Sequence, residues 1–137
     1  MDEVYQGSYI GMPVQIELIR ENRVVLQTYS EPLDSRQMIE LRDQMDQVIL
    51  PSAAGKMPII ADFSNIRNLP GTILTSGTSM IRKPHANSGQ IIFVTSNAFV
   101  NAMAHTFARL SFKQSIKVVH SLEEAYQAVD ALLSETG

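Results

Sequence analysis

The stretch Pro58–Thr72, PIIADFSNIRNLPGT, decides how the rest of the chain is interpreted. It begins with the apolar run Ile59-Ile60-Ala61, which is typical of a strand buried on both faces. The run breaks at Asp62, and Pro70-Gly71 separates it from a helix that we expect to begin at Thr72. A strand–turn–helix transition of this kind lies at the carboxyl edge of a parallel sheet, where open α/β folds usually place their functional groups.

The chain before this stretch predicts a β-hairpin followed by a helix. Residues Val14–Ile19 alternate apolar and polar side chains, Arg20–Arg23 is a polar turn, and Val24–Tyr29 is β-branched and apolar. Since the second strand is the more uniformly apolar, we expect it to lie further inside the sheet. Asp34 is a plausible N-cap for the helix, with Gln37 three residues later completing a capping-box pattern.

The chain after it alternates helices and strands. A weaker helix over 72–83 precedes a strand over 90–95, which we expect to be buried, and a helix capped by Ser96 or Asn97 follows. A strand over 115–119 then leads into a helix that opens on the capping box Ser121-Leu122-Glu123-Glu124. The predicted order is β-β-α-β-α-β-α-β-α in a single domain, residues 1–137. We therefore predict an α/β fold with a mixed, mostly parallel sheet opened by a hairpin.

Two helices carry apolar stripes that indicate their buried sides. The first stripe consists of Met38, Leu41, Met45, Val48 and Ile49, and the second of Phe99, Met103, Phe107 and Leu110. On the second helix Asn101, His105 and Arg109 share the opposite face, which we expect to be solvated.

Composition excludes several classes of function. The chain has 137 residues, 45% of them hydrophobic, with a net charge of −3 and no cysteine. Disulfides and thiolate chemistry are therefore excluded. No Lys/Arg run exceeds the pair Arg82-Lys83, so we expect neither a nucleic-acid partner nor a membrane surface as partner. With no signal-peptide pattern and no apolar run of about 20 residues, we expect a cytoplasmic protein.

The element order and three segments together resemble the STAS and SpoIIAA-like families, which include the bacterial anti-sigma factor antagonists. The segments are PIIADFSNI at 58–66, GQIIFVTSN at 89–97 and IKVVHSLEEAYQAV at 116–129. The last two are closer to the SpoIIAA-like branch. The resemblance covers most of the chain and implies a regulatory domain that binds another protein, such as a kinase-like partner.

In the antagonists, the turn after the central strand carries a serine that a partner kinase phosphorylates. The resemblance places that position on Gly71, so the usual switch serine is absent. Thr72 follows at once, and a phosphate there would meet a helix N-terminus, which favours negative charge. We therefore name Thr72 as the candidate phosphorylation site, beside its simpler role as an N-cap.

No pattern of catalytic residues is visible. His120 ends a strand just before a helix, and Asp62 ends the central strand, so these two are the candidates for an enzyme. No carboxylate is adjacent to His120 in sequence, and Ser64 and Asn65 favour an Asx turn at Asp62. Metal-ligand and phosphate-loop spacings do not occur. We expect a protein that is not an enzyme, with no cofactor and no metal.

The residues around the predicted helix start form the candidate interaction surface. Hydroxyls at 72, 75, 76 and 79 share one helical face, which fits a partner-binding face or a close-packed one. The predicted surface comprises Asn65, Arg67, Asn68, Gly71, Thr72, Thr75, Ser76 and Ser79. We expect a non-catalytic protein-interaction module, with a homodimer as a further expectation. The alternative is a small-molecule or lipid-binding domain whose methionines and phenylalanines line an apolar pocket.

Overall fold

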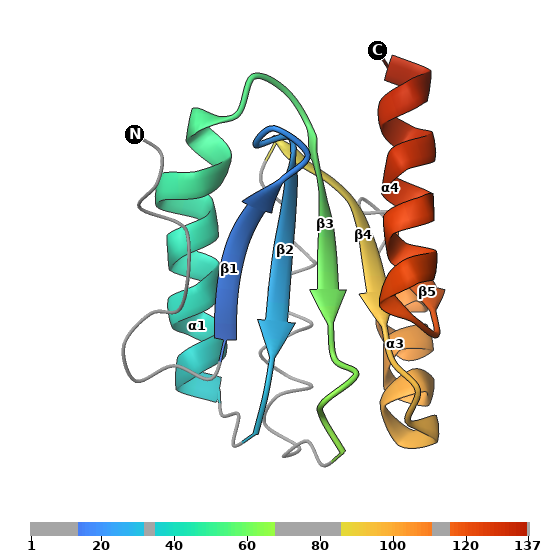
Figure 1. Ribbon diagram of the computed structural model, residues 1–137. Helices are drawn as coiled ribbons and strands as arrows, with labels where there is room; N and C mark the ends of the chain where they lie inside the picture. The colour runs from blue at the N-terminus through green and yellow to red at the C-terminus, as the bar shows by residue number, and fades with distance from the viewer. Residues whose placement is uncertain (1–13, 32–34, 68–85, 111–115, 137) are drawn as a thin grey trace.

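The computed structural model describes residues 14–31, 35–67, 86–110 and 116–136. These residues form a sheet in the spatial order β1-β2-β3-β4-β5 (Figure 1). The strands are β1 (Val14–Ile19), β2 (Val24–Tyr29), β3 (Met57–Asp62), β4 (Ser88–Val94) and β5 (Ile116–Val119). β1 pairs antiparallel with β2, and every later pair is parallel. The predicted α/β class, with its opening hairpin and mostly parallel sheet, is confirmed.

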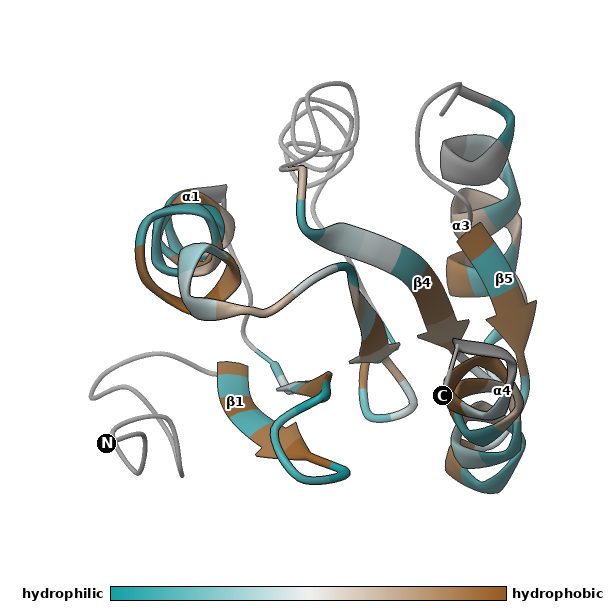
Figure 2. Ribbon diagram, turned by 90° about the horizontal axis from the view of Figure 1, so that it is seen from above, coloured by the Kyte–Doolittle hydropathy of each residue, from teal (hydrophilic) through white to brown (hydrophobic). Residues whose placement is uncertain are grey.

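Helices cover both faces of the sheet. The described helices are α1 (Ser35–Gln44), α3 (Ala98–Leu110) and α4 (Leu122–Thr136). Viewed from above, α1 and α3 lie on one side of the strands and α4 lies on the other (Figure 2). None of the described helices is long and apolar enough to cross a bilayer. The helix expected from Thr72 and the N-cap expected at Asp34 fall outside the described residues.

The period-two alternation of the strands divides the core into two apolar clusters. In β3, Ile59 and Ala61 point to the cluster under α1 and α3, whereas Ile60 points to the cluster under α4. All six residues of β3 are buried, because the strand has neighbours on both sides and helices over both faces. This confirms the interpretation of Ile59-Ile60-Ala61.

The expectation that the strand over 90–95 is buried holds for only part of its length. In β4 only the last three residues, Ile92 to Val94, are buried, and the first four are half-buried. The reason is the length of the neighbouring strand, because β5 begins its pairing with β4 at Ile91. The residues of β4 before Ile91 therefore have a strand partner on one side only.

The first helix departs from its predicted stripe at one residue. Met38, Leu41, Met45 and Ile49 are buried, but Val48 is 38% exposed. The chain passes from α1 into a π-helical turn, Met45–Ile49, and then a 3-10 turn, Leu50–Ser52. Because a π-helix bonds i to i+5 and is wider than an α-helix, it rotates Val48 out of the stripe while Ile49 and Leu50 remain in the core.

The hairpin turn between β1 and β2 is left-handed. Arg20, Glu21 and Asn22 have φ values of 54°, 60° and 65°. The Arg23 amide donates to the Ile19 carbonyl oxygen at 3.1 Å and to the Arg20 carbonyl oxygen at 3.2 Å. Left-handed backbone costs a non-glycine residue free energy, so this turn is held in place by contacts elsewhere.

Candidate functional site

The carboxyl ends of β2, β3, β4 and β5 lie at one edge of the sheet, at the bottom of Figure 1, because these strands are parallel. We call the segments that leave them the carboxyl edge: residues 30–31 after β2, 63–67 after β3, 95–97 after β4 and 120–121 after β5. The described part of the predicted interaction surface lies here.

The segment after β3 begins with the Asx turn that the sequence predicts. Asp62 is 6% exposed, and its Oδ1 accepts a hydrogen bond from the Ser64 amide at 3.0 Å. Two residues later the Ile66 amide donates to the Phe63 carbonyl oxygen at 3.0 Å, and the Ile66 side chain is fully buried. Since Ile66 anchors this turn to the core, Asn65 is exposed at the carboxyl edge.

Arg67 is exposed at the end of the same segment and is tied to the exit of β2. Its backbone amide donates to the carboxylate of Glu31. Because the bond uses the backbone amide, it does not engage the guanidinium group of Arg67. Nothing local in the sequence indicated this contact, since the two residues are 36 positions apart.

The segment after β4 caps helix α3. Thr95 is fully buried, and its Oγ1 accepts from the Asn97 amide at 3.1 Å. The Oδ1 of Asn97 in turn accepts from the Val100 amide at 3.1 Å, so Asn97 is the N-cap rather than Ser96. Ser96 remains exposed between them.

The segment after β5 forms the predicted N-cap at Ser121, but the reciprocal bond of Glu124 goes to the amide of His120, one residue before the cap, instead of to the amide of Ser121. Ser121 Oγ accepts from the Glu124 amide at 3.1 Å, and Glu124 Oε1 accepts from the His120 amide at 2.8 Å. The Glu124 carboxylate is thereby committed to the start of α4.

His120 connects the exits of β4 and β5. Its Nδ1 lies 3.2 Å from the carbonyl oxygen of Thr95. Because a carbonyl only accepts, Nδ1 is the donor, and Nε2 is the acceptor when the ring is neutral. The sequence places His120 at this edge correctly but does not reveal Thr95 as the group that orients it.

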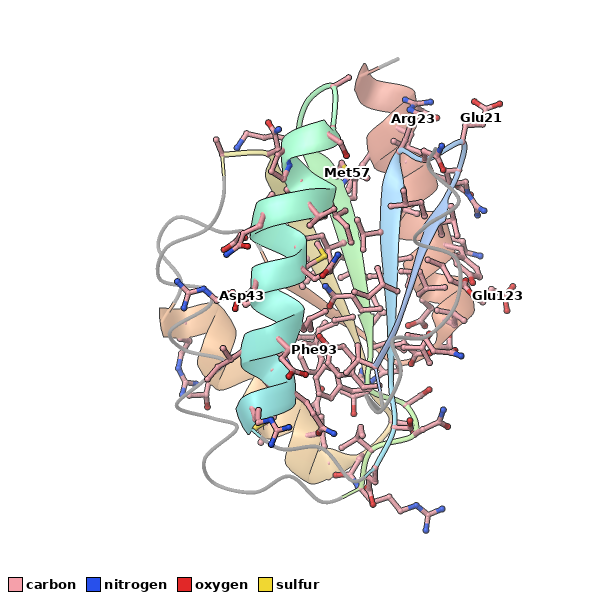
Figure 3. All side chains as sticks on the ribbon, turned by 90° about the vertical axis from the view of Figure 1, so that its left-hand side faces the viewer. Glu21, Arg23, Asp43, Met57, Phe93 and Glu123 are labelled. Carbon is pink, nitrogen blue, oxygen red and sulfur yellow. The ribbon has the colours of Figure 1, made fainter. Side chains whose placement is uncertain are left out.

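An aromatic stack supports the carboxyl edge from beneath. The ring centroids of Tyr29 and Phe63 are 4.1 Å apart, and those of Phe63 and Phe93 are 4.5 Å apart. Phe93 lies on the face of the sheet that α1 covers (Figure 3). The buried Tyr29 hydroxyl donates to Gln27 Oε1 at 2.8 Å, and burial raises the pKa of this phenol. Since the three rings come from the end of β2, the segment directly after β3 and the end of β4, they hold these strand ends together.

The described residues cover only part of the predicted surface. Asn65 and Arg67 are exposed, as an interaction surface requires. The other predicted residues lie outside the described residues: Asn68, Gly71, Thr72, Thr75, Ser76 and Ser79. Within the described segments, no group of three His, Asp or Glu side chains is arranged to hold a metal ion.

The face of α3 expected to be solvated is so only in part. His105 and Arg109 are exposed, but Asn101 is half-buried. Its Oδ1 is buried without a hydrogen-bond partner. Asn101 is four residues after the cap Asn97, and its amide donates to the Asn97 carbonyl oxygen at 2.8 Å, so it lies in the first full turn of the helix.

Comparison with known proteins gives a fold but no family. The NMR structure of the protein TM1081 matches 95% of this chain and 97% of its own, with a TM-score of 0.63 and 14% sequence identity. At that identity the likeness shows the fold alone. No protein-family model matches the chain, and no curated protein sequence matches it. The chain is a small α/β domain with the fold of TM1081.

Proposed function

We propose that this chain is a STAS or SpoIIAA-like regulatory module that acts by binding another protein through its carboxyl edge. The contact surface is formed by Asn65 and Arg67 after β3 and Ser96 after β4, with His120 and Ser121 beside them. The chain acts there without catalysing a reaction.

The observation that supports this proposal is the use of the polar groups at the edge. The carboxylates of Asp62 and Glu124 each accept a backbone amide of a turn or helix start, and so does the carboxylate of Glu31. These are structural roles, which fix the shape of the edge. The exposed polar groups that remain include the hydroxyls of Ser96 and Ser121, the amide of Asn65, the guanidinium of Arg67 and the imidazole of His120, which suit hydrogen bonding to a protein surface.

The rigidity of the edge also favours a binding role. Its four segments are linked to one another by the Glu31–Arg67, Thr95–His120 and Phe63–Val94 hydrogen bonds. A surface held in one conformation loses less entropy when a partner docks than a mobile one does. The absence of the usual switch serine, with glycine at position 71, favours constitutive binding over phosphorylation control.

Site-specific photo-crosslinking tests the proposal. A photoreactive amino acid placed at Arg67 or Ser96 is expected to form the same protein adduct in the native host. Matched controls carry it at Glu21 or Lys56, which are exposed at the opposite end of the parallel strands and should give no adduct. Asn65→Arg should reduce the Ser96 adduct about tenfold, since the few residues that cost more than about 1 kcal/mol when changed cluster near the centre of an interface.

Two outcomes would contradict the proposed surface. One is an adduct that forms equally well from Glu21 and Lys56. The other is a Ser96 adduct that Asn65→Arg leaves unchanged in a variant whose thermal unfolding matches that of the unsubstituted protein.

The alternative function, binding of a small molecule or lipid, has no specific observation in its favour. Met38, Met45, Met57 and Met103 belong to the apolar cluster under α1 and α3, together with Phe63 and Phe93. Side chains packed in this way act as core. Native mass spectrometry of the protein from its own host would favour the alternative if a ligand remained bound after purification.

A further inference from the structure

The two edge strands of the sheet differ in how they are protected from pairing with another strand. β5 is four residues long and carries the exposed Lys117 on its second position. β1 is six residues long, contains neither Lys, Arg nor Pro, and pairs with β2 in an unbroken register from Val14 to Ile19. Short length, charged side chains (lysine above all), proline and bulges are the usual means by which proteins prevent edge-to-edge pairing. β5 has the short length and a lysine, whereas β1 has only the single carboxylate of Glu17.

β1 also offers backbone groups for a new strand. Within the described part of the chain it has a strand neighbour on one side only, β2. Alternate N–H and C=O groups of an edge strand point away from the sheet, so β1 presents a row of donors and acceptors along its outer side.

We propose that β1 pairs antiparallel with β1 of a second copy of this chain. The two-fold axis passes by Ile16, which then faces Ile16 of the second copy. This register places Gln15 opposite Glu17 of the second copy, twice over by symmetry. It also places Val14 opposite Leu18 of the second copy.

The side chains of β1 are complementary to themselves in this register. Gln15 and Glu17 are both exposed and lie on the face that α4 covers elsewhere. Opposite one another across two strands, the amide of Gln15 donates to the carboxylate of Glu17, and such cross-strand pairs stabilise a sheet. On the other face Val14 and Ile16 belong to the apolar cluster, and the half-buried Leu18 packs against it. Pairing of the β1 strands therefore joins the apolar cluster under α1 and α3 of one copy to the same cluster of the second copy, and it covers Leu18.

The neighbouring symmetric register is unfavourable. An axis at Glu17 would place two Glu17 carboxylates directly opposite each other, and like charges in that position are destabilising. The axis at Ile16 avoids this contact. The resulting interface is isologous, so it closes at two copies and gives a dimer. The interface lies along the side of the sheet and leaves the carboxyl edge accessible. The proposed dimer therefore does not depend on the proposed function.

Two opposite changes at one exposed residue test the pairing. Gln15→Lys places an ammonium opposite Glu17 of the second copy and should tighten the dimer, whereas Gln15→Glu places a carboxylate there and should weaken it. Across two symmetric pairs, the dissociation constant should shift about two- to thirtyfold in each direction. Inside one chain Gln15 faces the uncharged Thr28, so neither change places a charge opposite another within its own hairpin.

Sedimentation equilibrium of the full chain, from micromolar to millimolar concentration, measures the effect. Lys117→Glu on β5 is the matched control and should leave the dissociation constant unchanged. A dimer that Gln15→Lys tightens and Gln15→Glu weakens supports the proposal. A chain that stays monomeric over the whole range, even with Gln15→Lys, overturns it, and so does a dimer that responds to Lys117→Glu but to neither change at Gln15.

Discussion

Arg20 and Asp130, 110 residues apart in the sequence, are joined by a two-point ion pair. Arg20 Nε donates to Asp130 Oδ1 at 2.7 Å, and Nη2 donates to Oδ2 at 3.3 Å. The same guanidinium lies 5.1 Å from the centroid of the Tyr126 ring. The contact fastens the left-handed hairpin turn to α4, so the opening hairpin and the last helix hold each other in place.

The Arg20–Asp130 pair makes stability depend on pH. Its hydrogen bond lowers the pKa of Asp130, so the folded protein holds this proton less tightly than the unfolded chain does. The ion pair therefore contributes fully to the free energy of unfolding at pH values above the pKa of Asp130 in the unfolded chain. This contribution is lost as the pH falls through the pKa of Asp130 in the folded protein. Asp130→Asn should unfold at lower urea concentration than the unsubstituted protein at neutral pH, and the difference should vanish in strong acid.

The half-buried pair Arg42–Asp46, with its Nε and Oδ2 atoms 3.7 Å apart and its residues four positions apart on the continuous helical segment, provides the control. Asp46→Asn should lower the urea midpoint less than Asp130→Asn does, because such pairs within one helix contribute little. A neutral-pH midpoint for Asp130→Asn that equals that of the unsubstituted protein would contradict the predicted role of the ion pair.

Glycine at position 21 should stabilise the protein. Glu21 sits at φ 60° in the hairpin turn and is exposed, so its side chain can be removed with little loss of packing. Left-handed backbone costs an ordinary residue about 1–2 kcal/mol, and glycine avoids this cost. Glycine also loses more conformational entropy on folding than other residues do, which offsets part of the gain. Glu21→Gly should therefore raise the free energy of unfolding by about 0.5–1 kcal/mol in urea titrations. The control Lys117→Gly, in strand β5, should lower the free energy of unfolding by a similar amount. A loss of stability in Glu21→Gly would contradict the predicted strain at the left-handed Glu21 backbone.

Those parts of the fold that depend on local sequence were predictable. The hairpin strands occur at Val14–Ile19 and Val24–Tyr29, as their alternating and apolar patterns indicated, and Ser121 is the expected N-cap, with Glu124 bonded to the amide of His120. In each case the residues that determine the structure lie within a few positions of one another. The Asx turn at Asp62 was predictable for the same reason.

Features that join distant segments could not be derived from local patterns. Glu31 and Arg67 meet only because β2 and β3 are parallel neighbours, and the pairing of Arg20 with Asp130 needs the whole sheet to bring α4 to the hairpin. The exposure of Val48 follows from a π-helical turn. A stripe predicted with 3.6 residues per turn assumes a regular α-helix, so it cannot anticipate the wider turn. Local sequence therefore places Asn65 and Arg67 after the central strand, but the hydrogen bonds that join one segment of the carboxyl edge to another depend on the tertiary structure.

Gly89 should tolerate no side chain. A Cβ added there would lie 2.8 Å from the carbonyl carbon and oxygen of Met57 and 3.0 Å from the nitrogen of Pro58. These are backbone atoms of β3, at the register shift between Met57 and Ile59, so they cannot move aside without disturbing the pairing of β3 with β4. Gly89→Ala should cost about 1–3 kcal/mol of unfolding free energy.

Gly55 is the matched control for this substitution. A Cβ there meets nothing within 4 Å, so Gly55→Ala should change stability by less than about 0.5 kcal/mol or raise it slightly. Urea unfolding of both variants checks the pair of predictions. Equal midpoints for the two variants would show that the close approach at Gly89 is not maintained in solution.

The buried hydrogen bond between Tyr29 and Gln27 should behave as a coupled unit. Gln27 is 6% exposed and Tyr29 is 2% exposed, and the tyrosine hydroxyl donates to Gln27 Oε1. Tyr29→Phe leaves Gln27 Oε1 without this donor, and Gln27→Leu leaves the hydroxyl without this acceptor. Each change should cost about 1–3 kcal/mol, whereas the double variant should cost less than their sum, because it removes both polar groups together.

The same pair gives a test at alkaline pH. Burial raises the pKa of Tyr29, so its contribution to stability is complete below the ordinary phenol value of 10.0 and declines as the pH rises above it, because only the unfolded chain ionises readily. The unsubstituted protein should therefore lose more stability above pH 10.0 than Tyr29→Phe does, as measured by urea unfolding. Parallel alkaline profiles for the two proteins, or strictly additive costs in the double variant, would mean that water reaches the hydroxyl and that the aromatic stack beneath the carboxyl edge is open.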